Sequence, residues 1–237
     1  TACLSLITLM AMAQIDAKLK AKLDQQVKEL EPKIIEWRRY FHEHPELSNQ
    51  ETKTGERIAN QLKALGLEVQ YPVAKTGVVA ILKGNKPGPV VALRADIDAL
   101  PITERNSLPF LSKAKALFSG QETGVMHACG HDSHMAMLLA TAEILSKNKN
   151  ELKGTVKFIF QPAEEGAPIN DGVSGAELMV KEGVLENPKV DAIFGLHIQS
   201  LLPSGQLAYR SGGLMASVDG FNIKVKGQGA HGATPWD

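Results

Sequence analysis

The sequence has little cysteine and no excess of charge of either sign, and each deficit excludes a class of protein. Two cysteines among 237 residues cannot build a disulfide scaffold. A chain of this length with 43% hydrophobic residues can bury its core without one, and it is neither disordered nor collagen-like. The 26 Lys and Arg residues equal the 26 Asp and Glu residues, so nucleic acid is not an expected partner.

The first 14 residues, TACLSLITLMAMAQ, carry no charge and end in Ala-Met-Ala before Gln14. This small-x-small pattern after an apolar run is typical of the end of a secretory signal peptide. We therefore expect residues 1–14 to be a signal-peptide remnant and the protein to be periplasmic or secreted. The run is too short to span a bilayer, so no stable membrane insertion is expected. The alternatives are a buried N-terminal helix, or an uncleaved anchor if the apolar run extends upstream.

Cys3 lies within this segment, so the mature protein would carry Cys129 alone. A single thiol in an oxidising compartment needs protection. Metal ligation provides it, because a coordinated thiolate is held deprotonated and is less available for oxidation.

Hydrophobic periodicity predicts an α/β domain with three layers, α/β/α. Apolar residues recur at helical spacing in four segments, 16–41 (with Pro32 as a candidate break), 52–65, 133–145 and 175–181. Short Val/Ile-rich runs predict buried strands at 77–82, 90–94, 155–160 and 190–196. We expect further strands at 206–210 and 218–225 and a domain boundary near Gly213, so that residues 15–213 form one domain and residues 214–237 open a second. The chain stops at Asp237 after a strand-like stretch, and we expect further residues to follow in the complete protein.

Metal-binding residue types are concentrated in the segment MHACGHDSH, residues 126–134. Five groups that can bind metal lie within these nine residues: His127, Cys129, His131, Asp132 and His134. Cys129 and His131 lie two residues apart on a glycine-containing loop, where thiolate and imidazole can converge on one ion. The alternative is a polar helix cap with a buried cysteine.

Three predicted strands deliver further polar groups at their carboxyl ends, where ligands bind in open α/β sheets. Glu164 and Glu165 follow the strand in FIFQPAEEG, His197 ends the strand in DAIFGLHI, and Asp98 follows the strand in ALRADIDALP. One of two adjacent carboxylates can bind metal while the other serves as general base. A carboxylate such as Asp98 can orient a ligating histidine. Taken singly, His197 is more simply a core histidine and the Glu pair a solvated loop. Together these groups indicate a catalytic metal site that could hold two ions.

These motifs, together with HPELS (residues 44–48) and GQGAHGATPW (residues 227–236), resemble the metal-dependent amidohydrolases and carboxypeptidases of the aminoacylase, hippurate hydrolase and auxin-conjugate hydrolase group. The resemblance implies a catalytic domain of the dinuclear-metal peptidase type, followed by the truncated start of a small α/β lid domain that dimerises. It implies two divalent ions, Mn, Zn, Co or Ni, bound by Cys129, His131, Glu165 and His197.

The resemblance also assigns roles beyond the metal ligands. Glu164 would be the general base, Asp98 would steady a metal ligand, and His231 would reach the partner subunit's site to stabilise the oxyanion. A further metal-ligating histidine and most of the lid would follow residue 237, so the fragment alone is expected to be inactive.

The function expected is hydrolysis of the amide bond of small N-acyl amino acids, hippurate-like or N-acetylated, or of dipeptide-like substrates. Two alternatives stay open. One is a metal-independent thiol hydrolase with Cys129 as nucleophile and His131 or His127 as base. The other is an exported protein that binds metal or substrate without turnover.

Overall fold

The computed structural model describes residues 16–166, 174–217, 221 and 223–236. Its contacts divide the chain into two units, residues 1–198 and 199–237. The first unit contains all the helices and strands found among the described residues. The second contains only turns and extended chain in its described part.

A mixed sheet of five strands forms the centre of the first unit. The strands are β1 (Glu68–Val73), β2 (Gly77–Lys83), β3 (Lys86–Asp96), β6 (Lys153–Gln161) and β7 (Ala192–Gly195), in the order β1-β2-β6-β3-β7. β2 runs antiparallel to β1 and β6, whereas β3 runs parallel to β6 and β7. The carboxyl ends of β6, β3 and β7 therefore meet at one edge. A separate hairpin joins β4 (Lys115–Phe118) to β5 (Gln121–Gly124).

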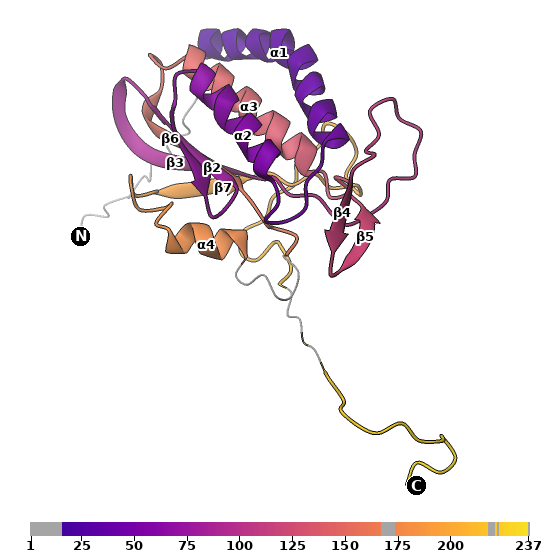
Figure 1. Ribbon diagram of the computed structural model, residues 1–237. Coiled ribbons are helices and arrows are strands. Elements are labelled where there is room, and N and C mark those ends of the chain that lie inside the picture. The colour runs from indigo at the N-terminus through magenta and orange to yellow at the C-terminus, as the bar shows by residue number, and fades with distance from the viewer. Residues whose placement is uncertain (1–15, 167–173, 218–220, 222, 237) are drawn as a thin grey trace, which may run out of the picture. The chain divides into compact units, whose positions relative to one another are not determined.

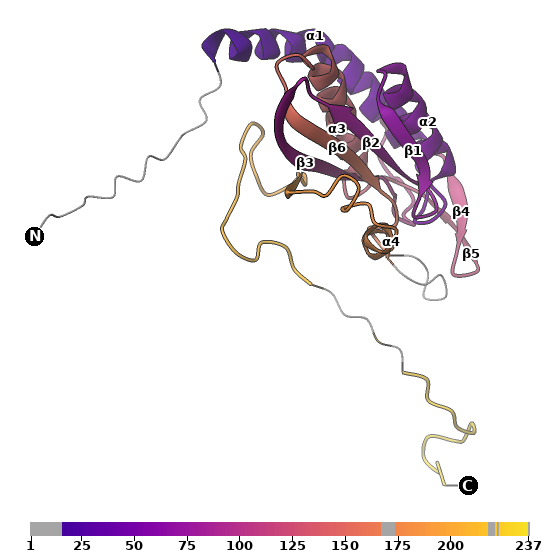
Figure 2. The ribbon, with the colours of Figure 1, turned by 90° about the vertical axis from the view of Figure 1, so that its left-hand side faces the viewer.

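Helices cover both faces of this sheet, as the three-layer prediction required (Figures 1 and 2). On one face lie α1 (Ala17–Glu43), α2 (Thr52–Ala64) and α3 (His131–Lys147), and on the other lies α4 (Gly175–Lys181). Alternate residues of β2 divide between the two cores: Val78 packs with the three long helices, and Val79 packs with Met179 of α4. This alternation follows from the two-residue period of a strand.

Local sequence signals mark the start of α1 and the end of α2. The Asp16 side chain accepts hydrogen bonds from the backbone N–H groups of Lys18 and Leu19 at 3.0 Å and so caps α1. Pro32 does not divide this helix, which runs unbroken from Ala17 to Glu43 and bends partway along its length (Figure 1). A proline removes one backbone hydrogen bond, which packing of both halves against the core can offset. Gly66, with φ +76°, ends α2 as expected.

Several predictions of strands were wrong. β1, β4 and β5 were not expected, because their sequences alternate weakly or are short. β7 is not buried as predicted: Phe194 is 61% exposed, since β7 lies at the sheet edge and nothing in the described part of the first unit covers it. Residues 206–210 form no strand, because no described segment pairs with them.

Other expectations fall partly or wholly outside the described residues. Residues 1–14 lie outside them, as do four members of the strand expected at 218–225, whose described members are not in a strand. The boundary near Gly213 stays a prediction. Among the described residues, no helix combines the length and apolarity needed to cross a bilayer.

Candidate metal centre

The carboxyl ends of three neighbouring strands and the start of α3 bring the predicted ligands together. β3 leads into Asp98, β6 leads into Glu164 and Glu165, and β7 leads into His197. Gly130 precedes α3 with φ +96°, a left-handed conformation that favours glycine, and a Cβ there would lie 2.3 Å from Ile198. This turn places His131 at the first position of α3, facing the strand ends.

Five of the predicted site residues form one cluster. Cys129 Sγ lies 3.3 Å from His197 Nε2. His131 Nε2 lies 3.7 Å from Glu165 Oε1 and 3.8 Å from Glu164 Oε2. These distances from His131 are too long for hydrogen bonds. Cys129, His131 and His197 form one group of potential metal donors, and His131, Glu164 and Glu165 form another, with the donor atoms of each group within 4.8 Å of one another.

Hydrogen bonds on the far side of each ring turn two imidazole nitrogens toward this space. His131 Nδ1 donates to the backbone carbonyl of Asp98 at 2.7 Å, and His197 Nδ1 donates to the carbonyl of Ile198 at 2.6 Å. A carbonyl only accepts, so in each neutral ring Nε2 carries the lone pair. Metal-binding histidines in proteins are oriented in this way.

Two atoms of the cluster are buried without a partner among the described residues, His131 Nε2 and Glu165 Oε1. A buried polar atom without a hydrogen bond is costly, so it calls for a ligand or water. Thiolate, imidazole and carboxylate are together the donors that Zn²⁺ and similar borderline ions prefer. The residues present therefore fit a divalent metal.

Charge in the cluster favours a bound cation. Burial lowers the pKa of His131, but the hydrogen bond to Asp98 and the charges of Asp96 and Asp98 outweigh it and raise the pKa to about 9. Burial, followed by a hydrogen bond with Glu165 and the charges of Glu165 and Glu164, raises the pKa of the Cys129 thiol to about 12. Burial and the neighbouring carboxylates Asp96 and Glu165 also raise the pKa of Glu164 above its usual range. Carboxylates thus outnumber cations around these groups.

Asp98 connects the two sides of the cluster. Its Oδ2 accepts hydrogen bonds from Ser48 Oγ at 2.6 Å and from the backbone N–H of Glu165 at 2.9 Å, and its Oδ1 lies 3.4 Å from His131 Nδ1. Asp98 therefore orients His131 through its backbone carbonyl and fixes the backbone of Glu165 through its carboxylate.

Comparison with known proteins identifies the family. Residues 92–236 match the model of peptidase family M20/M25/M40. The chain belongs to this family. The resemblance expected from the motifs is therefore confirmed.

Relatives within the M20 family cover nearly all of the chain. A thermostable carboxypeptidase 2 of Saccharolobus solfataricus is 49% identical over 92% of this chain and 52% of its own length. An N-acetylcysteine deacetylase of Bacillus subtilis is 48% identical over 86% of this chain and 50% of its own. A solved dinuclear metal-binding M20 peptidase of Bacillus subtilis is 47% identical, with a TM-score of 0.64 over 74% of this chain and 45% of that one. The chain spans about half the length of the curated relatives it matches.

Of the five residues in the segment 126–134 that can bind metal, only Cys129 and His131 belong to the cluster. His134 uses both ring nitrogens, because Nδ1 donates to Asp96 Oδ1 at 2.6 Å and Nε2 accepts from the backbone N–H of Ile198 at 2.9 Å. That bond to His134 and the charges of His131 and Arg94 overcome the effect of burial and lower the pKa of Asp96 to about 2.

Asp132 belongs to a different buried network, beside α1. Its Oδ2 accepts hydrogen bonds from Arg38 Nε and from His42 Nδ1, each at 2.9 Å. His42 Nε2 in turn lies 2.9 Å from Glu104 Oε1. His127 is fully buried, its ring nitrogens have no partner in the described part of the chain, and burial lowers its pKa to about 4.

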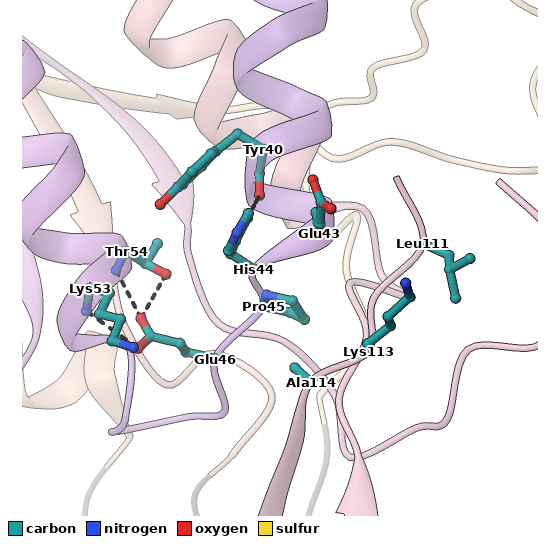
Figure 3. A pocket seen from close by; sticks show the side chains of 10 residues that line it. All are labelled: Tyr40, Glu43, His44, Pro45, Glu46, Lys53, Thr54, Leu111, Lys113 and Ala114. Atoms are coloured by element: carbon teal, nitrogen blue, oxygen red, sulfur yellow. Dashed lines mark hydrogen bonds between the residues drawn. The ribbon is translucent and has the colours of Figure 1, made fainter. Parts of the chain in front are cut away.

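Neither His231 nor the residues that line one cavity of the first unit belong to the candidate metal-binding groups among the described residues. His231 belongs to the second unit, where its Nδ1 accepts from the backbone N–H of Ala233 at 3.1 Å, so its role stays a prediction. A cavity of about 370 Å³ contains none of the predicted ligands (Figure 3). It is lined by Tyr40, Glu43, His44, Pro45, Glu46, Lys53, Thr54, Leu111, Lys113 and Ala114.

Two residues that contact the site's framework were not identified from the sequence, Ser48 and Glu51. Ser48 stood in the motif HPELS, but nothing in the motif itself indicates its bond to Asp98. Glu51 stands directly before α2, where an acidic residue is typical of a helix cap. Its side chain makes no capping bond and turns away from the helix.

Proposed function

We propose that the complete protein is a metal-dependent amidohydrolase that cleaves small N-acyl amino acids or dipeptide-like substrates. The observation that carries this is the cluster of metal donors with unpartnered buried atoms, His131 Nε2 and Glu165 Oε1, beside a second carboxylate, Glu164. Family membership supports it, because relatives are named as a carboxypeptidase and a deacetylase of an N-acyl amino acid.

The metal ligands in this proposal are Cys129, His131, Glu165 and His197. The complete protein would bind two divalent ions. Mn, Zn, Co and Ni are all compatible with thiolate, imidazole and carboxylate donors. Bound there, such ions would polarise the substrate carbonyl and lower the pKa of a water molecule.

Glu164 is the general base in this proposal. Its side chain is 37% exposed and lies beside His131 rather than within a closed hydrogen-bond network. It would accept a proton from water as the oxygen attacks the amide carbonyl carbon. The same proton then passes to the departing nitrogen as the carbon–nitrogen bond breaks, which yields a carboxylic acid and a free amine. His231 is proposed to stabilise the oxyanion.

The sharpest test is Glu164→Gln, which keeps the size of the side chain and removes the base. We expect kcat to fall about 10³-fold, the middle of the range for general acid–base catalysis, while metal content stays unchanged. Glu177→Gln is the matched control, because Glu177 is exposed on α4 and its carboxylate pairs, among the described residues, only with Lys181. A Glu164→Gln enzyme with near-native turnover would overturn the assignment.

Release of free amino acid from benzoylglycine and from a panel of N-acetyl amino acids measures the activity. The complete protein is stripped of metal, then reloaded with Mn or Zn. Activity restored by metal alone supports the amidohydrolase and ranks its substrates. Stoichiometric metal uptake without turnover of any substrate would instead favour the non-catalytic binding protein.

One observation favours a second candidate, a thiol hydrolase. The 3.3 Å contact between Cys129 Sγ and His197 Nε2 has the reach of a nucleophile and its base. Reactive thiolates, however, lie in electropositive surroundings, whereas Cys129 is near three carboxylates. Full activity after exhaustive chelation, lost on thiol alkylation, would establish this alternative.

The remaining expectations are proposals about the complete protein. We propose export to the periplasm or beyond through the segment 1–14, and a lid domain that begins near residue 214 and forms a homodimer. Mass determination of the mature N-terminus and of the native assembly tests both.

A further inference from the structure

Glu51 is a buried carboxylate that the proposed mechanism does not use. The residue is 0% exposed. Its Oε1 accepts a hydrogen bond from the backbone N–H of Ala163 at 2.8 Å, and its Oε2 accepts one from Thr76 Oγ1 at 2.6 Å. A carboxylate removed from water is costly, so its position at this point in the fold requires a reason.

The Ala163 backbone is strained and directly precedes the proposed base. Its φ of +47° is in the left-handed region, which costs a residue other than glycine about 1–3 kcal/mol. Such a conformation persists only where the surroundings fix it. Here Glu51 binds the N–H of Ala163, and the Ala163 carbonyl accepts from the N–H of Gly175 at 3.2 Å. The direction in which the chain enters Glu164 depends on these two bonds.

Glu51 is itself held by a rigid frame at the start of α2. Glu46 accepts hydrogen bonds from the backbone N–H and the hydroxyl of Thr54 at 2.8 and 2.9 Å (Figure 3). Gly55 packs so closely that a Cβ there would lie 2.3 Å from the carbonyl oxygen of Thr76. Neither Glu51 nor its partner Thr76 can therefore shift without moving α2.

Resting on the proposed function, we propose that Glu51 is a positioning residue that sets the orientation of Glu164 through the Ala163 backbone. It touches neither substrate nor metal. It acts by satisfying an N–H group that would otherwise be buried without a partner, at a residue that adopts a strained left-handed backbone conformation directly before Glu164.

The chemistry of Glu51 predicts which substitution preserves this role. Burial raises the pKa of Glu51 to about 7, so a neutral group of the same shape is a close replacement. In Glu51→Gln the amide oxygen can accept from Ala163, and the amide nitrogen can donate to the Thr76 hydroxyl, which both donates and accepts. Glu51→Ala leaves the Ala163 N–H unpaired. Glu51→Asp keeps the carboxylate but is one methylene too short to reach both partners.

The kinetic test compares these variants in the complete, metal-loaded protein. We expect Glu51→Ala to lower kcat about 10- to 100-fold, the effect of misplacing a catalytic group by roughly 1 Å. KM and metal content should change little. Glu51→Asp should lose less, and Glu51→Gln should retain most of kcat. Leu62→Ala in the buried face of α2 is the matched control, since it destabilises the same helix without touching Ala163.

Hydrogen exchange of the peptide spanning residues 158–166 provides a readout that does not depend on activity. Glu51→Ala should speed exchange there, and Glu51→Gln and Leu62→Ala should not. A Glu51→Ala or Glu51→Asp enzyme with native kcat would overturn the inference. So would a Glu51→Gln or Leu62→Ala enzyme whose kcat falls as far as that of Glu51→Ala. If the wild-type protein hydrolyses no amide, the proposed function fails. Independently of that result, unchanged hydrogen exchange in Glu51→Ala would refute the inference that Glu51 fixes the Ala163 backbone.

Discussion

The side chains of one short motif, residues 126–134, differ in whether their polar atoms have hydrogen-bond partners. Cys129 and His131 present atoms that have few or no partners in the described structure. Asp132 and His134, one and three residues beyond His131, are held by other bonds: Asp132 Oδ2 accepts from Arg38 and His42, while its Oδ1 has no partner among the described residues, and both ring nitrogens of His134 are bonded. The residue types are equally suited to metal. What separates His131 from Asp132 and His134 is the direction in which α3 points each side chain: His131 toward the cluster, Asp132 toward Arg38 and His42 of α1, and His134 toward Asp96.

The comparison teaches that an unpartnered atom marks a ligand where it faces other metal-binding groups, since His127 has two unpartnered ring nitrogens and belongs to none of the candidate metal-binding groups among the described residues. A buried histidine whose two nitrogens are both bonded, like His134, has no lone pair left to offer. A buried histidine bonded on one nitrogen, like His131, has one. Substitution of a histidine like His134 should therefore change the stability of the fold, and substitution of one like His131 should change metal affinity.

Removing a ligand should have the largest effect. His131→Ala deletes the central imidazole of the cluster, and we expect metal content to fall below one ion per chain and kcat/KM to drop by at least about 10³-fold. Metal analysis of the purified complete protein and the benzoylglycine assay measure the two losses. A His131→Ala enzyme that retained native metal content would show that the unpartnered nitrogen does not mark a ligand.

Removing the partner of a buried charge should have the next largest effect, on stability rather than on metal. Asp132→Ala leaves Arg38 and His42 without their shared carboxylate, and breaking such a buried pair costs about 3–5 kcal/mol. Metal content per folded protein should stay near the native value. Denaturant unfolding of the complete protein tests this, with Asp24→Ala as control, because Asp24 forms an exposed ion pair within α1.

His134→Ala sharpens the comparison within a single residue type. It should destabilise the fold by about 2–3 kcal/mol, because Asp96 loses a charged hydrogen bond and the N–H of Ile198 loses its acceptor. Most metal should be retained. Complete loss of metal with an intact fold would identify His134 as a ligand and break the distinction between His131 and His134.

Much of the fold could be predicted from the sequence, because strong periodicity marks elements that are buried on one side. The bounds of α2, α3, α4, β2 and β6 are close to those expected. β1 alternates only weakly, and β7 is apolar yet exposed, so its apolar character does not show whether another layer covers it. Pairing partners far along the chain decide such strands, and local patterns do not contain that information.

For the site, the position of ligands at the carboxyl ends of strands is enough to predict that Asp98, Glu164, Glu165 and His197 share one edge of the sheet. The same rule cannot divide the histidines of the segment 126–134 between ligand and framework, since that division depends on which side of α3 each one occupies. Nor can it identify Glu51, whose partners Thr76 and Ala163 lie 25 and 112 residues away. Long-range hydrogen bonds of this kind become visible only when the chain is folded.

The smallest expected effect concerns the pH dependence of the network beside α1. The hydrogen bond to Asp132 raises the pKa of His42, and the bond to Glu104 adds to it against the opposing effect of burial. Arg38 shares Asp132, the ring of Phe110 lies against His42, and His127 is close enough for its charge to act on Asp132. Asn106 and the backbone N–H of Ser112 donate to Glu104. Because the folded pKa is raised, the stabilisation from protonated His42 is fully present below the unfolded value of about 6.5. It is lost as pH rises through the folded pKa.

His42→Gln, which cannot be protonated, tests this directly. The difference in unfolding free energy between wild type and the variant should be larger at about pH 6 than at about pH 9, by on the order of 1 kcal/mol. Denaturant unfolding of both proteins across that range measures it, and Asp24→Ala should show no such trend. A constant difference would mean that His42 is neutral in the folded protein throughout, so that the network beside α1 is held by hydrogen bonds alone and not by a buried charge.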